Sequence, residues 1–96
     1  MKELRRTLLF DKWLKELKDP RAQARIQTRL DRLEDGNPGV VEPVGEGVSE
    51  LKIDYGPGYR VYFCERGEVL IIILAGGNKK TQPKDIRNAL ELARGW

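Results

Sequence analysis

The sequence contains no histidine and one cysteine, Cys64, among its 96 residues. Without histidine the chain cannot form Ser-His or Cys-His nucleophilic pairs, and it lacks both an imidazole general base and the usual nitrogen ligand of zinc. A single cysteine allows no internal disulfide, which is typical of proteins in a reducing cytosol. We therefore expect an inert, packed thiol at Cys64 and no metal or other cofactor.

Long apolar segments are also missing. The longest apolar run, residues 69–75, is far too short for a membrane-spanning helix. Near the start, the apolar run at residues 8–10 is too short for a signal peptide. These patterns predict a soluble cytoplasmic protein with no membrane partner.

The length and composition predict one globular domain over residues 1–96. Apolar residues make up 40% of the chain, which is normal for a packed protein and too high for disorder. Eighteen Lys and Arg residues oppose fifteen Asp and Glu residues, for a net charge of +3. This mild excess permits a nucleic-acid partner without requiring one, so the distribution of the charges must decide.

The first part of the chain predicts a helical hairpin. A short strand is possible over residues 3–10, and a helical apolar period begins at Phe10. Asp19-Pro20 interrupts this period, because proline disfavours helix in the residue before it and suits the first turn of a new helix. The second helix should cover residues 20–34, with an apolar stripe at Ala22, Ile26, Leu30 and Leu33.

The remainder predicts strands followed by a last helix. A short strand at residues 40–44 contains Pro43, which favours an edge position. Further strands are expected at residues 48–55, 59–64 and 69–74; the last should be central, because it is apolar on both faces. Thr81 is a suitable cap for a C-terminal helix. We predict an α+β fold, with an antiparallel sheet of three to five strands against the helical hairpin and the C-terminal helix at its side or far face.

The segment GGNKKTQ, residues 76–82, is a candidate anion site. Its glycines allow close approach of a ligand, and the following helix offers free N–H groups and the positive end of its dipole. Lys79 and Lys80 add two full charges, and Gln82 could contact RNA. The alternative is a solvated turn with ordinary surface lysines.

Lys52 and Arg60 are expected on one face of the sheet. They lie at comparable distances from the turn at residues 56–58, so an antiparallel pair brings them together. Arginine suits phosphate because its fork donates two hydrogen bonds at once. Cross-strand salt bridges to Glu50 or Asp54 are the alternative role.

Three tyrosines surround this face: Tyr55, Tyr59 and Tyr62. Aromatic rings beside basic residues can stack on the bases of single-stranded RNA, although packing within the strands is the alternative. The arginines of the second helix lie off its apolar stripe and are expected to form a solvated, ion-paired face at Arg21, Arg25, Arg29 and Arg32.

In this order the motifs resemble the RelE/ParE toxin superfamily, and within it the HigB-like branch of phage-derived Gp49-like or addiction-module killer proteins. The resemblance rests on these pieces: FDKWL at residues 10–14, GVSELKI at 47–53, GPGYRVYF at 56–63, and GGNKKTQ at 76–82. It covers nearly the whole chain and implies a microbial RNase fold.

The resemblance also implies a function. Such toxins cleave messenger RNA, usually on the ribosome, and are neutralised by an antitoxin that is often a helix-turn-helix protein. By position, Arg60 matches an arginine near the scissile phosphate, Lys52 a basic residue of the sheet, and Lys79 or Lys80 a basic site after the last strand. The C-terminal tyrosine or histidine of better-studied relatives has no counterpart here. A non-enzymatic gyrase inhibitor of the ParE kind, or an inactive remnant that only binds its antitoxin, are the alternatives.

Overall fold

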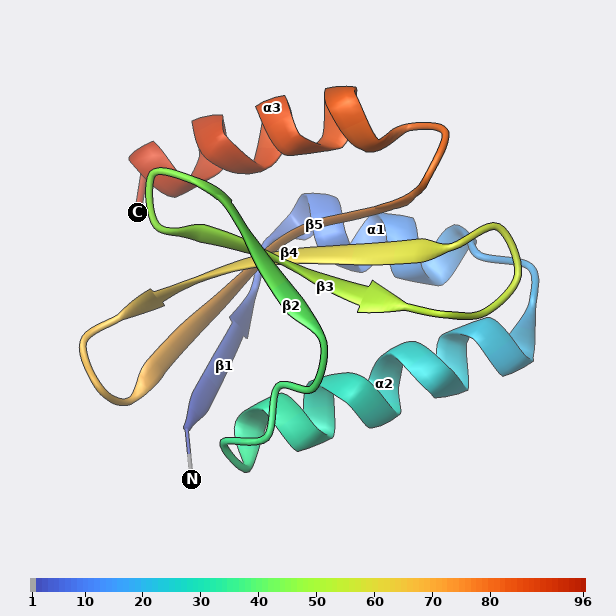
Figure 1. Cartoon of the computed structure of the whole chain (residues 1–96), viewed down its shortest axis with the longest axis horizontal. Helices are drawn as coiled ribbons and strands as arrows, with labels where there is room; N and C mark the ends of the chain where they lie inside the picture. The colour runs from blue at the N-terminus through green and yellow to red at the C-terminus, as the bar shows by residue number, and fades with distance from the viewer. Residues whose placement is uncertain (1) are drawn as a thin grey trace.

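A computed structural model describes residues 2–96. Five strands and three helices follow one another along the chain (Figure 1). Their bounds are β1 Glu3–Arg6, α1 Leu8–Glu16, α2 Pro20–Glu34, β2 Val41–Gly45, β3 Val48–Ile53, β4 Tyr59–Arg66, β5 Leu70–Asn78 and α3 Gln82–Arg94.

The starts of α1 and α2 follow from their capping residues. The Thr7 hydroxyl accepts a hydrogen bond from the Phe10 amide and donates one to the Leu74 carbonyl. This cap starts α1 at Leu8, so the strand considered for residues 3–10 ends at Arg6. Asp19 caps α2 by accepting from the Arg21 amide, and α2 covers the predicted residues 20–34.

The sheet has the strand order β1-β5-β4-β3-β2. Strands β2 to β5 form an antiparallel meander as expected, but β1 pairs with β5 in parallel, with Glu3 opposite Leu70. The sheet is therefore mixed, and its middle strand is β4. A parallel partner for β5 can come only from a distant segment, because parallel strands need a long crossover between them.

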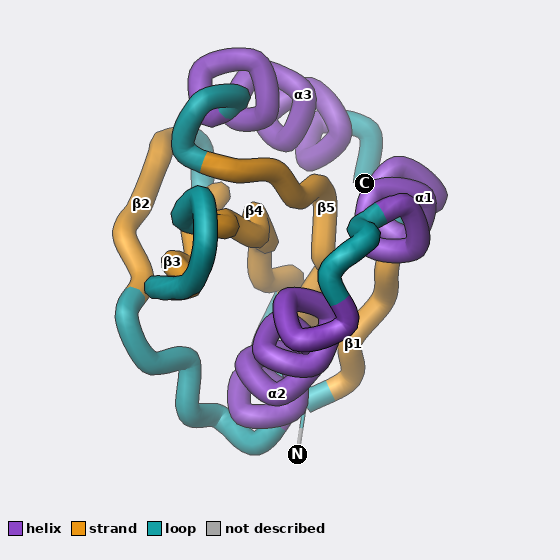
Figure 2. The backbone as a smooth tube through the Cα atoms, turned by 90° about the vertical axis from the view of Figure 1, so that its right-hand side faces the viewer, coloured by secondary structure: helices purple, strands orange, loops and turns teal. Residues whose placement is uncertain are grey.

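Both faces of the sheet are covered. Helices α1 and α2 run in roughly opposite directions over one face, and α3 covers the other (Figures 1 and 2). Alternate residues of β5 enter the two cores: Ile71 and Ile73 face α1 and α2, whereas Ile72 and Leu74 face α3. The predicted α+β layers are confirmed, and the C-terminal helix takes the far face. None of the helices within residues 2–96 has the length and apolar character needed to cross a membrane.

Candidate nucleic-acid interface

Lys52 and Arg60 are direct partners across β3 and β4, as the sequence predicted. Lys79 follows the end of β5, where the paired strand β4 begins. The three side chains line one groove of about 570 Å³ at this end of the sheet, together with the turn at residues 56–58 and Arg29. Three positive charges from three different strands or strand ends therefore meet at one surface.

The Arg60 guanidinium is held in place by the strands around it. Its side chain is only 13% exposed, and its Nε lies 3.5 Å from the Glu50 carboxylate. Nη1 donates to the Gly58 carbonyl at 2.9 Å. Within residues 2–96, Nη2 has no hydrogen-bond partner, and Nε has none of good geometry. Because Nε is buried, Nη2 is the unused donor group of this fixed guanidinium, which lines the groove.

Glu50 is the centre of the polar contacts beneath this groove. It is 1% exposed, and its Oε1 accepts from the Tyr62 hydroxyl at 3.2 Å and from Gln82 Nε2 at 2.5 Å. The same oxygen faces Arg60. The salt bridge between Arg60 and Glu50 was one of the roles expected from the sequence and is confirmed, whereas the burial of Glu50 and its contacts with Tyr62 and Gln82 were not expected. The place of Glu50 two residues before Lys52, on the same face of β3, was the available signal.

The tyrosines correct the expectation of an exposed stacking surface. Tyr62 is fully buried under α3, and this burial and the nearby Glu50 carboxylate raise the pKa of its hydroxyl. Tyr59 is 8% exposed on the opposite face, with its ring edge against Trp13 at 6.1 Å between centroids. Neither ring offers a face to a base, so the alternative of packing within the strands holds for both. Only Tyr55 remains partly exposed.

The remaining predicted site residues differ in their contacts and in whether they line the groove. Lys52 Nζ lies 3.0 Å from Glu42, a partner on β2 that differs from the Glu50 or Asp54 considered. Lys79 and Lys80 are both exposed, but only Lys79 lines the groove. Gln82 turns inward, and its Nε2 donates a hydrogen bond to Glu50.

The start of α3 also differs from the anion site that the sequence suggested. The Asn78 side chain accepts hydrogen bonds from the Lys80 and Thr81 amides. Thr81 makes no side-chain cap, and its hydroxyl donates to the buried Asp85 carboxylate. Two backbone donors are therefore occupied and a carboxylate already lies at this helix start, which leaves the lysine charges as its main attraction for an anion.

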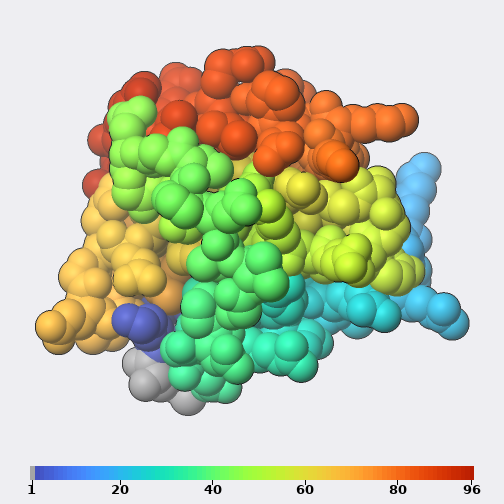
Figure 3. Space-filling view, in the orientation of Figure 1, coloured from blue at the N-terminus to red at the C-terminus, as the bar shows by residue number. Residues whose placement is uncertain are grey.

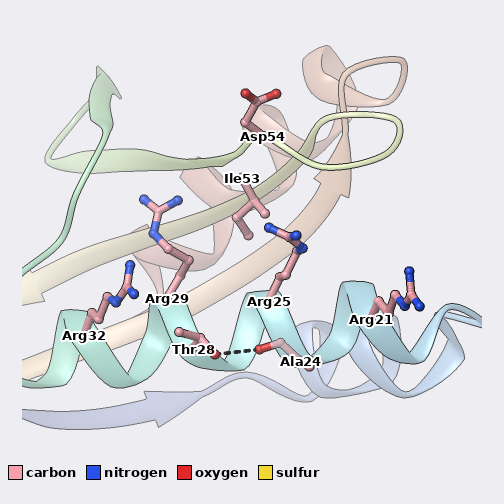
Figure 4. A pocket seen from close by; sticks show the side chains of 8 residues that line it. All are labelled: Arg21, Ala24, Arg25, Thr28, Arg29, Arg32, Ile53 and Asp54. Carbon is pink, nitrogen blue, oxygen red and sulfur yellow. Dashed lines mark hydrogen bonds between the residues drawn. The ribbon is translucent and has the colours of Figure 1, made fainter.

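A second basic groove adjoins the first. It has a volume of about 660 Å³ and runs along α2, lined by Arg21, Ala24, Arg25, Thr28, Arg29, Arg32, Ile53 and Asp54 (Figure 4). The space-filling view shows the β3–β4 turn between α2 and the start of α3 (Figure 3). Contrary to the expected ion-paired face, none of the four arginines forms a salt bridge within residues 2–96.

Arg29 connects the two grooves because it lines both. Its guanidinium donates to the carbonyls of Lys52 at 2.5 Å and Pro38 at 3.1 Å. Burial and the neighbouring charge of Arg32 lower the pKa of Arg29. The hydrogen bonds to these two backbone carbonyls hold the Arg29 guanidinium in place despite the repulsion from Arg32.

Comparison with known proteins places these residues in a family. The model of the family described as Phage derived protein Gp49-like (DUF891) matches residues 12–95, which include both grooves. A protein of Haemophilus influenzae, named only as an uncharacterized protein, is 49% identical over 92 residues, covering 96% of this chain and 93% of its own length. The chain belongs to the phage-derived Gp49-like family.

Proposed function

We propose that this protein is the toxin of a toxin–antitoxin module and acts as an endoribonuclease on messenger RNA, in the manner of HigB-like members of the RelE/ParE superfamily. The observation that carries the proposal is the Arg60 guanidinium, anchored by Glu50 and Gly58, with unused donors beside Lys52 and Lys79. Fixed arginine donors next to further cations suit a phosphodiester better than a neutral ligand.

In the proposed reaction the 2′-hydroxyl of the RNA attacks the adjacent phosphorus, and the bond to the 5′-oxygen breaks. The products are a 2′,3′-cyclic phosphate and a free 5′-hydroxyl. Arg60 stabilises the additional negative charge of the pentacoordinate phosphorane. A fixed donor of this kind is worth about 2.7–4 kcal/mol of transition-state stabilisation.

The protons need a base and an acid. Tyr62 is unsuited to either role, because it is buried and its hydroxyl already donates to Glu50. Asp54 is an exposed carboxylate that lines both grooves, so it is our candidate for taking the proton of the 2′-hydroxyl. The Lys79 ammonium is our candidate for protonating the leaving 5′-oxygen. Positioning of the message on the ribosome would supply further rate.

The test is cleavage of message by purified protein in a translating system, with the ends of the fragments mapped. We expect Arg60→Ala to reduce the cleavage rate by about 10²- to 10³-fold, as for loss of one transition-state donor. Arg5→Ala is the matched control, because Arg5 is an exposed arginine on β1 away from the groove. Equal rates for Arg60→Ala and wild type would reject the assignment of Arg60.

The proposed partner is an antitoxin, often of the helix-turn-helix kind in such modules, with an acidic segment that covers the basic grooves. Charge complementarity would favour this contact and would block RNA entry. Co-expression of the neighbouring reading frame should restore growth of cells that are arrested by this protein. A frame that restores growth without binding the purified protein would contradict this part of the proposal.

A gyrase inhibitor of the ParE kind is the second candidate. The inward turn of Tyr62 and Gln82 favours it, since it removes two polar side chains that a nuclease site could use. A supercoiling assay with added protein separates the two functions. Inhibition of gyrase without any RNA cleavage would replace the nuclease by this candidate.

A further inference from the structure

The arginines of α2 form a row with regular spacing. Arg21, Arg25 and Arg29 are four residues apart, so an α-helix places each about 6 Å further along its axis. Arg32 extends the row by a shorter step of about 4.5 Å. This spacing is similar to that of neighbouring phosphates on one RNA strand. The row lines one groove, whereas the apolar stripe of the same helix lies in the core.

The arginines of this row form no salt bridge within residues 2–96, and only Arg21 interacts with a nearby carboxylate, that of Asp19. Asp31, which lies on the same helix, accepts from the Gln27 amide and forms no salt bridge with the row. Among the described residues that line this groove, Asp54 alone carries a carboxylate. Burial, and after it the positive charge of the neighbouring Arg32, lowers the pKa of Arg29, so at least these two cations of the row repel each other. A bound polyanion would relieve this repulsion.

Two of the arginines are also oriented. Arg29 is held by the carbonyls of Lys52 and Pro38, and the Arg25 guanidinium lies over the Tyr55 ring at 4.7 Å from its centroid. Figure 4 shows both side chains rising from α2 toward β3 on the same side of the helix. Fixed guanidinium groups lose less side-chain entropy on binding than free ones.

We propose that the α2 row binds consecutive phosphates of the same RNA strand whose scissile phosphate lies at Arg60. This inference rests on the proposed function and extends it from one phosphate to a path along the strand. The path is continuous, because Arg29, Ile53 and Asp54 line both grooves. We favour RNA over an acidic protein segment because regularly spaced arginine forks match a phosphate backbone.

The experiment measures binding without cleavage. The probe is an unstructured, fluorescein-labelled 2′-O-methyl RNA of about 15 nucleotides, in which the attacking hydroxyl is blocked. Fluorescence anisotropy over a range of salt concentrations gives Kd and its salt dependence. The test variant is Arg21→Gln/Arg25→Gln/Arg32→Gln, which leaves Arg29 and its backbone contacts in place. The matched control, Lys12→Gln/Lys15→Gln/Arg87→Gln, removes three exposed charges outside both basic grooves.

We expect the test variant to bind the probe at least about tenfold more weakly than the control at 0.1 M salt. The slope of log K against log salt is negative and should become less negative by about 2, since each contact to single-stranded RNA contributes about −0.7 and three are lost. Equal loss in both variants would show an effect of net charge alone and would overturn the proposal. Loss in neither variant would overturn it too.

Two further results test the phosphate path independently of the proposed nuclease activity. Tight groove-dependent binding of the probe, with no cleavage of message by the wild type, would support the path and reject the nuclease. An oligoglutamate peptide of matched charge is the second probe. Groove-dependent binding of this peptide, with unchanged binding of the RNA, would identify an acidic-protein site and overturn the phosphate path.

Discussion

Glu50 connects three side chains beneath the candidate site. Its buried carboxylate contacts Arg60, Tyr62 and Gln82, which come from β4 and the start of α3. A buried carboxylate is costly unless charged and polar partners surround it. The same contacts that stabilise Glu50 therefore hold Arg60 beside the groove, so Glu50 acts on the proposed chemistry through Arg60.

We expect Glu50→Ala to lower the free energy of unfolding by about 3–5 kcal/mol, because it leaves the mostly buried Arg60 without its charged partner. Urea denaturation measures this loss. In an Arg60→Ala background the same substitution should cost at least 1 kcal/mol less, since the broken pair is then already absent. Equal costs in the two backgrounds would show that Glu50 and Arg60 are not coupled.

At the scale of single residues, the sequence predicted correctly which side chains of two neighbouring strands lie opposite each other. The pairing of Lys52 with Arg60 follows from their comparable distances to the turn at residues 56–58, and the structure confirms it. The exposed position considered for Tyr62 was wrong. Alternation along β4 shows only that Tyr62 and Val61 face opposite sides of the sheet. Whether the face with Tyr62 is open to solvent depends on α3, which is distant in sequence and covers it.

At the scale of elements, β5 depends on two glycines that let helices approach it from both faces. A Cβ at Gly76 would overlap the Trp13 ring of α1, and a Cβ at Gly77 would overlap the Asp85 carboxylate of α3. Gly77 is also the partner of Arg60 across β4 and β5. The GGN motif that the sequence suggested as a ligand contact is therefore first a packing requirement.

We expect Gly77→Ala to destabilise the fold by more than about 3 kcal/mol, because neither the strand backbone nor the buried Asp85 can shift without losing contacts. Thermal unfolding checks this. Gly95→Ala is the control: its new Cβ would meet the nearest atom at 3.6 Å, in ordinary contact, so the change should be within about 0.5 kcal/mol. A mild Gly77→Ala would mean that α3 can move away from the sheet.

The start of α2 is attached to the end of β3 by the hydrogen bond from the Tyr55 hydroxyl to Asp19 at 2.9 Å. This bond, with the amides of Ala22 and Arg21, lowers the pKa of Asp19 below its ordinary value of 3.8. A depressed carboxyl pKa stabilises the folded state above the ordinary value, and the contribution is lost as the pH falls through the folded pKa.

We therefore expect Tyr55→Phe to lower Tm at neutral pH, and the difference from wild type to vanish well below pH 3.8. Thermal unfolding followed by circular dichroism at a series of pH values measures it. An Asp19→Asn variant serves as the control, because its difference from Asp19→Asn/Tyr55→Phe should not change over the same acidic range. A wild-type difference that grew on acidification would contradict the sign of this linkage.

At the scale of the whole molecule, two cores share one sheet. The core under α1 and α2 and the core under α3 take alternate residues of β4 and β5, as Val61 and Cys64 illustrate. Loss of either core exposes one face of the strands that support the other. The two cores should therefore unfold together rather than in separate steps.

We expect one cooperative transition in urea. In a Trp96→Phe variant the tryptophan fluorescence reports Trp13, which packs beside the first core, while far-UV circular dichroism reports all helices and strands. Trp96 is 54% exposed, so its replacement should leave stability nearly unchanged. Two separated midpoints from the two signals would show that the α3 side melts independently.

The helices, the strands of the antiparallel meander and the inward face of α2 could be predicted from the sequence, because these depend on short-range periods and turns. The sequence also determined the pair of Lys52 and Arg60. The parallel pairing of β1 with β5 and the burial of Tyr62 by α3 could not be predicted, because they depend on packing between elements that are distant in the sequence. The tertiary structure alone brought the α2 arginines beside Arg60. A period assigns a side chain to a face of its own element, but packing between distant elements decides whether that face is core, groove or solvent.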